Sequence, residues 1–311
     1  MNGGIISYST QKRTQLLKMH RLRFIQSILL LFILFFRSLS FCEEGFATVL
    51  MYHRFDEPKY PSTNIDSKIF EEQMSLLKNQ NYNVLPLSEL ILFFEQKKRL
   101  PEKSIFITMD DGYKSIFAKA YPIMKKFNYP FSVFVSTDFI SNNSESNYMT
   151  WKMLKELSIN NVEILNHSSN HKSFLESSDE EILNSIIKGE KILKEKIGKS
   201  LKIFSFPYGD SNLKIESLLE SLDYKISFAQ HSSPIHLTEN KLRLPRFSLN
   251  NEYGNLKRFQ TIIKAQPLMA EDILPLDTKL DKKFPFLEFE TNFTPKKINC
   301  FINKNAKINK K

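Results

Sequence analysis

Cysteine is almost absent from this chain of 311 residues, which contains only Cys42 and Cys300. One follows the N-terminal apolar segment and the other lies in the C-terminal tail, so no framework of disulfides can staple a small fold. Neither position suggests a nucleophile or a metal ligand. The stability of the fold must therefore come from a hydrophobic core, and a chain of this length can build one large α/β domain or two smaller ones.

Acidic residues are absent from both ends of the chain. Residues 1–23 contain five Lys or Arg and residues 296–311 contain six, with no Asp or Glu in either segment. Because the net charge of the whole chain is +10, the body between these segments carries a net charge of −1. A near-neutral body gives little support to a nucleic-acid groove, and we expect no nucleic-acid partner.

The N-terminal segment lacks a hydrophobic run of full membrane-spanning length. Its apolar residues 24–36 lie between Arg23 and Arg37, and as a helix they would be about 20 Å long, against ~30 Å for the hydrocarbon core of a bilayer. A basic stretch followed by a short apolar run is typical of a signal peptide, or of a membrane anchor that is not cleaved. We therefore predict a signal peptide or membrane anchor over residues 1–42, with Met19 as an alternative start. The protein is then exported: periplasmic, extracellular or anchored to the membrane facing outward.

Past residue 43, stretches typical of strands and of helices alternate. The expected strands, short and rich in β-branched or aromatic residues, are Ala47–Tyr52, Ser104–Met109, Phe131–Ser136, Val162–Leu165, Lys202–Phe206 and Tyr224–Ala229. The expected helices are Ser67–Asn79, Ser88–Lys98, Tyr113–Phe127, Asp179–Ile197 and Leu213–Leu222. Ser178 and Glu181 form a capping box before the longest of them. This alternation predicts a parallel sheet or β/α barrel over residues 43–266.

Residues 267–311 form a C-terminal extension in this interpretation. They contain several prolines and no clear helical pattern, so we expect a few short strands. The last sixteen residues, which are rich in lysine, are expected to be disordered.

Polar side chains follow several expected strands at the point where each strand ends. His53, the pair Asp110-Asp111, His167 and Tyr208 each come directly after, or within two residues of, a different strand. The carboxyl ends of parallel strands meet at one face of a sheet or barrel, where the chemistry of such folds collects. We therefore expect these side chains to share one pocket.

The tandem carboxylates and two histidines form a candidate metal site. Taken alone, Asp110-Asp111-Gly112 after a strand is most often a turn, and His167 with His171 four residues later is most often a surface feature. Two imidazoles and one carboxylate at neighbouring strand ends, however, leave open positions on a divalent metal, as hydrolytic catalysis requires. One carboxylate can bind the metal while the other remains free as a base, and Gly112 allows the sharp turn.

These residues resemble the metal-dependent polysaccharide deacetylases, which share the NodB homology domain. The first family motif, usually Thr-Phe-Asp-Asp-Gly, reads Thr-Met-Asp-Asp-Gly at residues 108–112. The second, His-Ser/Thr-x-x-His, is matched by residues 167–171, and the third by Phe-Pro-Tyr-Gly at residues 206–209. The resemblance spans about residues 47–265. It implies an α/β fold, a distorted (β/α) barrel of the NodB type, here with an N-terminal signal or anchor segment and a short C-terminal extension.

The resemblance also implies roles for individual residues. Asp111, His167 and His171 would hold a divalent metal, with zinc as the first expectation, and Asp110 would be the general base. The backbone N–H of Tyr208 would help to stabilise the oxyanion. The division of labour is physically sensible because a carboxylate committed to a metal is a poor base.

The general acid departs from the most common family pattern. Many relatives carry a late Leu-x-His motif, but residues 243–247 contain no histidine. Members that act on extracellular poly-N-acetylglucosamine use a histidine after the first strand, so the resemblance implies His53 as the general acid. His231 and His236 are weaker alternatives, and a purely structural role for His53 stays open.

The arginine that orients the base also lies at a different position from the one usual in the family. Many relatives place it two residues before the proline of the third motif, where this chain has Ser205. The resemblance implies that Arg246 takes over this task, as in the poly-N-acetylglucosamine branch; a structural arginine is the other interpretation. A cation beside Asp110 would keep that carboxylate ionised near neutral pH.

The main functional hypothesis is a metal-dependent hydrolase that removes N-acetyl groups from N-acetylhexosamine units of a cell-envelope or extracellular polysaccharide. Trp151 and Tyr208 are the candidates for stacking on a sugar ring. The alternatives are a weak or inactive glycan-binding module that retains the fold, and a deacylase of a non-sugar amide, because none of these motifs reads the sugar itself. Any membrane association would come through the N-terminal segment.

Overall fold

A parallel sheet forms the centre of the protein. The computed structural model describes residues 45–141, 146–268, 270–277 and 287–291. The strands of the sheet are β1 (Ala47–Tyr52), β4 (Asn83–Leu85), β5 (Ser104–Met109), β6 (Ser132–Val135), β7 (Glu163–Asn166), β8 (Ile203–Ser205), β9 (Ile226–Phe228) and β10 (Phe247–Ser248). They run in the order β10-β1-β5-β6-β7-β8-β9, with β4 paired to the first half of β5.

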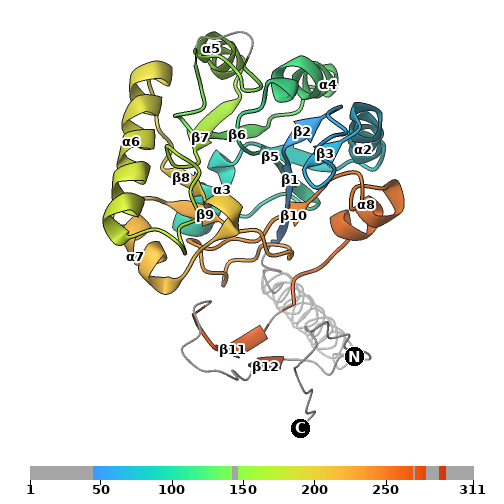
Figure 1. The fold of residues 1–311 in the computed structure, drawn as a ribbon. Coiled ribbons are helices and arrows are strands. Elements are labelled where there is room, and N and C mark those ends of the chain that lie inside the picture. The colour runs from blue at the N-terminus through green and yellow to red at the C-terminus, as the bar shows by residue number, and fades with distance from the viewer. Residues whose placement is uncertain (1–44, 142–145, 269, 278–286, 292–311) are drawn as a thin grey trace, which may run out of the picture. The chain divides into compact units, whose positions relative to one another are not determined.

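Helices connect the strands, and all but one of them lie around the outside of the curled sheet (Figure 1). They are α2 (Ser67–Asn79), α3 (Ser88–Gln96), α4 (Tyr121–Phe127), α5 (Trp151–Ile159), α6 (Asp179–Ile197), α7 (Leu213–Ser221) and α8 (Leu256–Ile263). A short parallel pair, β2 (Arg54–Phe55) and β3 (Asn64–Ile65), follows β1. The capping box of Ser178 and Glu181 is present at the start of α6, as the sequence predicts.

The sheet curls so far that its two edges nearly meet. β9 and β10 are the ends of the strand order, and the chain before β10 bridges the space between them. Leu244 pairs with Phe228 of β9, and Phe247 pairs with Leu50 of β1. Residues 244–248 therefore close the distorted barrel.

Side chains that alternate along each strand divide the core into an inner and an outer part. Phe106, Phe134 and Phe228 pack inside the barrel together with Leu90 of α3, which lies under the strands. Ile107 and other residues of the opposite strand faces pack against the surrounding helices α2, α4 and α5. Large apolar side chains therefore fill most of the interior.

A buried glutamate joins three segments of this core. The carboxylate of Glu163 in β7 accepts hydrogen bonds from the backbone N–H groups of Leu87 and Ser88, at the start of α3, and from the hydroxyl of Ser132 in β6. A buried carboxylate is costly unless it is hydrogen-bonded. Here its partners position α3 under the barrel.

The predicted elements agree with the structure over most of the barrel. All six expected strands and all five expected helices are present with small shifts at their ends, although the expected helix Tyr113–Phe127 begins as a π-helical segment at Ile116–Ala120. Six strands and helices in residues 43–266 were not predicted: β2, β3, β4, α5, β10 and α8.

The C-terminal extension contains the expected strands. β11 (Ala270–Leu274) and β12 (Glu288–Thr291) form an antiparallel pair. The expected disorder of the last sixteen residues and the signal peptide or anchor over residues 1–42 both concern residues outside the described ranges, and the domain boundaries stay predictions. Within the described ranges, no helix combines the length and the apolar character needed to span a membrane.

Candidate active site

The site continues the inward-facing rows of the strands. Phe106, Thr108 and Asp110 lie two residues apart and share the inner side of β5, because side chains alternate along a strand. Phe106 belongs to the apolar interior, and Thr108 and Asp110 follow it toward the carboxyl end, both fully buried. The register of β10 and β1 brings Arg246 level with Val49, which pairs with Phe106 of β5. Arg246 therefore starts nearer the amino end of the barrel than Asp110, and its long side chain extends toward the carboxyl end to reach that carboxylate.

Arg246 holds Asp110 in a bidentate ion pair. Its Nη1 and Nη2 atoms donate to the two carboxylate oxygens, each over 2.8 Å. The other donors reach the Thr108 hydroxyl at 3.2 Å, the Ser205 hydroxyl at 2.8 Å and the Ala229 carbonyl at 3.2 Å. All N–H donors of the guanidinium are thereby used, and neither side chain of the pair is exposed to solvent.

This pairing decides the charge of Asp110. Burial alone would raise the pKa of the carboxyl group, but the Arg246 guanidinium and the His167 imidazole outweigh it, so the pKa of Asp110 lies below its ordinary value. An ionised carboxylate is able to accept a proton. Asp110 is therefore in the form that a general base requires at neutral pH.

Asp111 has different neighbours because the backbone turns sharply after β5. Asp111 has a φ of 71° and Gly112 a φ of 77°, both in the left-handed region that is costly for residues other than glycine. A Cβ atom on Gly112 would lie 3.0 Å from Cγ1 of Val135. The turn therefore demands glycine, and it separates the environments of two adjacent carboxylates.

His167 and His171 face the carboxylate of Asp111. The Nε2 atom of His167 lies 3.3 Å from Asp111 Oδ1, and that of His171 lies 3.0 Å from the same oxygen. The other ring nitrogen of His167, Nδ1, lies 2.7 Å from the Ser205 carbonyl, to which it donates its hydrogen. This fixes the ring so that the lone pair of Nε2 points toward Asp111.

These three residues fit a divalent metal. One ligand atom from each lies within 4.8 Å of the others. Asp111 Oδ1 is buried and has no hydrogen-bond partner among the described residues, although two imidazole nitrogens lie close to it. An orphaned buried oxygen is expensive, and a cation at this point would satisfy it. A carboxylate and two imidazoles are also a donor set that zinc accepts.

His53 lies next to the two carboxylates. Tyr52 of β1 is opposite Met109 of β5, and the Asp110 N–H donates to the Tyr52 carbonyl over 2.9 Å, so the following residue, His53, lies beside Asp110. Burial lowers the pKa of His53, and the nearby Asp111 and Asp110 partly offset this effect. The placement is compatible with the predicted acid role, which stays a prediction.

A pocket of about 450 Å³ includes two of the three candidate metal ligands, Asp111 and His171. It is lined by His53, Ser62, Thr63, Asp111, Tyr113, Phe139, Tyr148, His171, Tyr208, Gln230 and Ser248. The ring of Tyr208 packs edge-on against His171, with 4.7 Å between ring centroids, and the residue is 60% exposed. Its backbone has a φ of 59°, so the Pro-Tyr-Gly segment bends back over the ligands.

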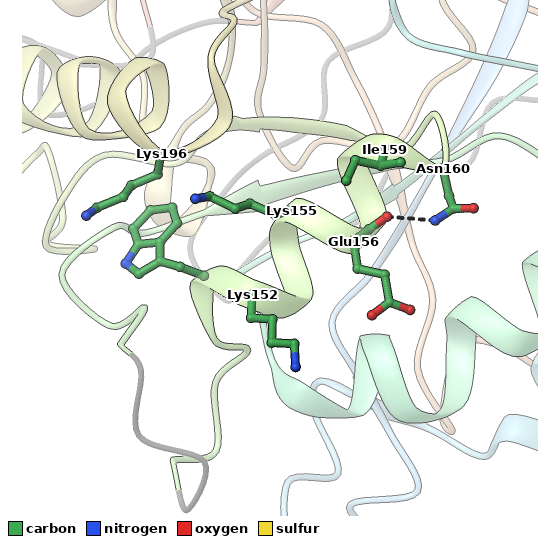
Figure 2. Close-up of a pocket in the computed structure, with 7 residues that line it drawn as sticks. Lys152, Lys155, Glu156, Ile159, Asn160 and Lys196 are labelled. Atoms are coloured by element: carbon green, nitrogen blue, oxygen red, sulfur yellow. Dashed lines mark hydrogen bonds between the residues drawn. The ribbon is translucent and has the colours of Figure 1, made fainter.

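Trp151 lies elsewhere. It is the first residue of α5 and lines a separate pocket of about 560 Å³, together with Lys155 and Lys196, which are labelled in Figure 2. Trp151 does not line the pocket that contains Asp111. Its predicted contact with substrate stays a prediction, and it would have to involve a part of the polysaccharide away from the unit at Asp111.

The weaker candidates for the general acid do not line the pocket either. His236 follows Ile235, whose backbone pairs with Ala47 at the amino end of β1. Both of its ring nitrogens have partners: Nδ1 lies 2.6 Å from the Thr238 hydroxyl and Nε2 lies 3.1 Å from Glu239. The backbone carbonyl of His231 accepts a hydrogen bond from the N–H of Arg246, but its side chain is not part of the pocket lining.

Some pocket residues were not predicted. Tyr113, Tyr148 and Phe139 line the pocket, yet they lie outside the three motifs. Tyr113 directly follows Gly112 of the first motif. This proximity was the one feature of the sequence that could have indicated Tyr113. Phe139 and Tyr148 come from the long connection between β6 and α5, which starts at the carboxyl end of a strand, where binding residues collect.

The chain is similar to several known proteins. Residues 97–227 match the family model described as polysaccharide deacetylase. A poly-beta-1,6-N-acetyl-D-glucosamine N-deacetylase of Staphylococcus aureus (strain MSSA476) is 25% identical over 235 residues, which cover 68% of this chain and 81% of the relative.

Solved structures share the fold. The Streptococcus pyogenes deacetylase PplD in complex with acetate is 19% identical with a TM-score of 0.66, over 71% of this chain and 99% of PplD. The structure of IcaB from Ammonifex degensii is 20% identical with a TM-score of 0.63, over 71% of this chain and 98% of that one. The matched motif positions gather at one end of this barrel, and by the family model residues 97–227 are a polysaccharide deacetylase domain.

Proposed function

We propose that this protein is a metal-dependent deacetylase that removes N-acetyl groups from the N-acetylhexosamine units of an extracytoplasmic polysaccharide. A polymer of the poly-β-1,6-N-acetylglucosamine class is the first candidate, because the S. aureus relative is named for this substrate. Export is supported by the predicted signal peptide or anchor over residues 1–42.

One observation carries the proposal: two adjacent carboxylates differ in whether their oxygens have hydrogen-bond partners. Asp110 is saturated by a fully buried arginine, whereas Asp111 keeps a buried oxygen without a hydrogen-bond partner beside two imidazole nitrogens. If both carboxylates served stability alone, there would be no reason for Asp111 to keep a buried oxygen without a partner. A base next to a cation site explains both.

The chemistry follows from these positions. A divalent metal held by Asp111, His167 and His171 would polarise the acetamide carbonyl and make water more acidic. The ionised Asp110 would take a proton from the attacking water at a carboxylate oxygen, while Arg246 keeps that carboxylate in place.

Breakdown of the tetrahedral intermediate needs a proton on the departing amine nitrogen. His53 lines the pocket on the side of the carboxylates and is our choice for the group that delivers it. The N–H of Tyr208 is our choice for a donor to the oxyanion. After release of acetate and the free amine, Asp110 carries one proton more and His53 one proton fewer, and proton exchange with solvent returns both residues to their starting forms.

The proposal is tested by measuring acetate release from β-1,6-linked N-acetylglucosamine oligomers. We expect activity in the zinc-loaded protein, loss of activity with a chelator, and recovery when metal is added back. Asp110→Asn should retain bound metal and lose about 100- to 10,000-fold in turnover, because it removes a proton acceptor without removing a ligand.

The controls separate this function from the alternatives. Activity that is equal with and without chelator would reject the metal-dependent mechanism. Binding of the oligomers without acetate release by the metal-loaded protein would indicate a glycan-binding module. Full activity of Asp110→Asn would show that the base is another residue.

A further inference from the structure

A row of stacked planar side chains runs along the pocket. The guanidinium carbon of Arg54 lies 3.9 Å from the ring centroid of Tyr60 and 3.4 Å from that of Tyr113. Tyr113 stacks on Tyr148, with 5.1 Å between centroids and 25° between planes. Tyr148 stacks in turn on Phe139, with 5.0 Å and 14°. We call these five side chains the aromatic row.

The inner end of the aromatic row is fixed. Arg54 is buried, and its Nη1 atom donates to Glu57 over 2.6 Å. The other carboxylate oxygen of Glu57 accepts a hydrogen bond of 2.6 Å from the Ser115 hydroxyl, which itself accepts the N–H of Phe55. The guanidinium therefore cannot rotate out of the stack without losing its ion pair with Glu57 and its contacts with two tyrosine rings.

The backbone fixes the middle of the aromatic row. Tyr113 and Tyr148 face each other across an isolated antiparallel bridge. The N–H of Met149 donates to the Gly112 carbonyl over 2.9 Å, and the N–H of Lys114 donates to the Asn147 carbonyl over 2.8 Å. The row is thus tied to the turn that carries Asp111.

The outer end of the aromatic row is open. Phe139 is 38% exposed, although one face of its ring is covered by Tyr148. Phe139, Tyr148 and Tyr113 all line the pocket of Asp111 and His171. A tyrosine phenol is protonated at neutral pH, so the hydroxyl of Tyr148 can donate a hydrogen bond.

We propose that Phe139 and Tyr148 form a binding subsite for a pyranose ring of the polysaccharide, in the unit adjacent to the one that is deacetylated. The proposal rests on the proposed function and adds where the rest of the polymer binds. A hexosamine chair with equatorial substituents presents C–H groups on its faces and hydroxyls at its edge. The exposed ring surface of Phe139 can pack against the C–H groups of the sugar face, and the phenol of Tyr148 can form a hydrogen bond with a sugar hydroxyl.

Rigidity makes this subsite effective. Ordering flexible side chains on binding costs free energy, but the aromatic row is already ordered by Arg54, Glu57 and the backbone bridge. An adjacent sugar held there would place its neighbour at the metal ligands. The subsite would therefore make longer oligomers better substrates than the single sugar.

The test compares substrates of increasing length. We expect the KM of the wild-type protein to fall from N-acetylglucosamine to its β-1,6-linked hexamer. Phe139→Ala should raise the KM for the hexamer about 2- to 10-fold, the range that corresponds to loss of one aromatic contact. It should lower kcat/KM for the hexamer more than kcat/KM for the single sugar, and it should leave the metal content unchanged. Phe139→Tyr, which keeps the ring, should behave like the wild type.

A matched control is Phe46→Ala. Phe46 is 37% exposed, almost the same fraction as Phe139, but it precedes β1 at the amino end of the barrel. This variant should leave the KM for the hexamer unchanged. An equal rise of KM in both variants would indicate a general loss of structure instead of a lost subsite.

Failure of the subsite and failure of the proposed function give different results. Acetate release with the same dependence on length in Phe139→Ala and the wild type would overturn the subsite alone. If no acetate is released, calorimetric binding of the hexamer decides: binding that weakens in Phe139→Ala supports the subsite without the hydrolysis. Absence of both binding and acetate release would overturn both.

Discussion

The carboxyl and amino ends of the barrel both hold histidine beside a carboxylate. At the carboxyl end, Asp111 Oδ1 lies within 3.3 Å of two imidazole nitrogens and has no hydrogen-bond partner among the described residues. At the amino end, both ring nitrogens of His236 are engaged, one by the Thr238 hydroxyl and the other by Glu239. The residue types at the two ends are similar. The ring nitrogens of His236 have partners, however, whereas Asp111 Oδ1 has no hydrogen bond.

This difference teaches how a functional histidine can be told from a structural one. Buried polar atoms are almost always hydrogen-bonded when they serve stability alone. His236 follows this rule, whereas Asp111 Oδ1 breaks it beside two imidazole nitrogens in a pocket. An unsatisfied carboxylate oxygen that faces two imidazole nitrogens is thus stronger evidence of a functional site than the presence of histidine.

The largest effect should come from the carboxyl end. His171→Ala removes one of the three candidate ligands, so we expect the purified protein to lose bound zinc and at least about 100-fold in deacetylase activity. Metal analysis and acetate release measure the two effects. His236→Ala is the matched control and should keep both. Retention of stoichiometric zinc by His171→Ala would refute the ligand assignment.

The next effect concerns the buried ion pair. Arg246→Leu leaves Asp110 buried without its cation, which should cost about 3–5 kcal/mol of unfolding free energy in urea titrations. Removing the cation also raises the pKa of Asp110, whose pKa lies below the ordinary value of about 4 in the intact pair. Less of the base is then ionised at a given acidic pH, so the acid limb of kcat/KM should move to higher pH.

A second variant guards against a simple failure to fold. Arg246→Lys keeps a positive charge but cannot make the bidentate contact, and we expect a smaller shift of the acid limb in the same direction. An acid limb that is identical in the wild type and in Arg246→Lys or Arg246→Leu would show that the guanidinium does not tune the base.

The smallest effect should come from the amino end. His236→Ala removes the partner of Thr238 and Glu239, and we expect a loss of about 1–2 kcal/mol in unfolding free energy. Acetate release per folded molecule should not change. A loss of activity without a loss of stability would mean that the two ends of the barrel are coupled.

Most of the barrel was predictable because its strands are buried on both sides. Runs such as Ser104–Met109 are short, apolar and β-branched, and all six residues are buried in the structure. β10 was not predictable, because two residues carry no pattern and their strand character depends on the register with β1. α8 was missed although Phe259, Ile262 and Ile263 form a helical stripe.

The residues of the site that belong to motifs could be predicted from the sequence. The residues that reach the site through packing could not. The positions of Asp110, Asp111, His167 and His171 follow from strand ends. The stacking of Tyr148 on Phe139 depends on how a connecting segment lies beside the turn at Gly112. No local pattern encodes such a contact. Likewise, Trp151 matches a family position in the sequence, yet the fold directs it to another pocket.

The position of Arg246 in the closing segment links chemistry to the completion of folding. A folding intermediate in which residues 244–248 have not yet docked has no cation beside Asp110, so its carboxylate is either protonated or costly to bury. β10 is only two residues long, and short edge elements open locally more easily than the rest of a sheet. Fraying of this one seam would therefore remove the cation beside Asp110 while the other strands remain intact, so the charge of this carboxyl group depends on the docking of a two-residue strand.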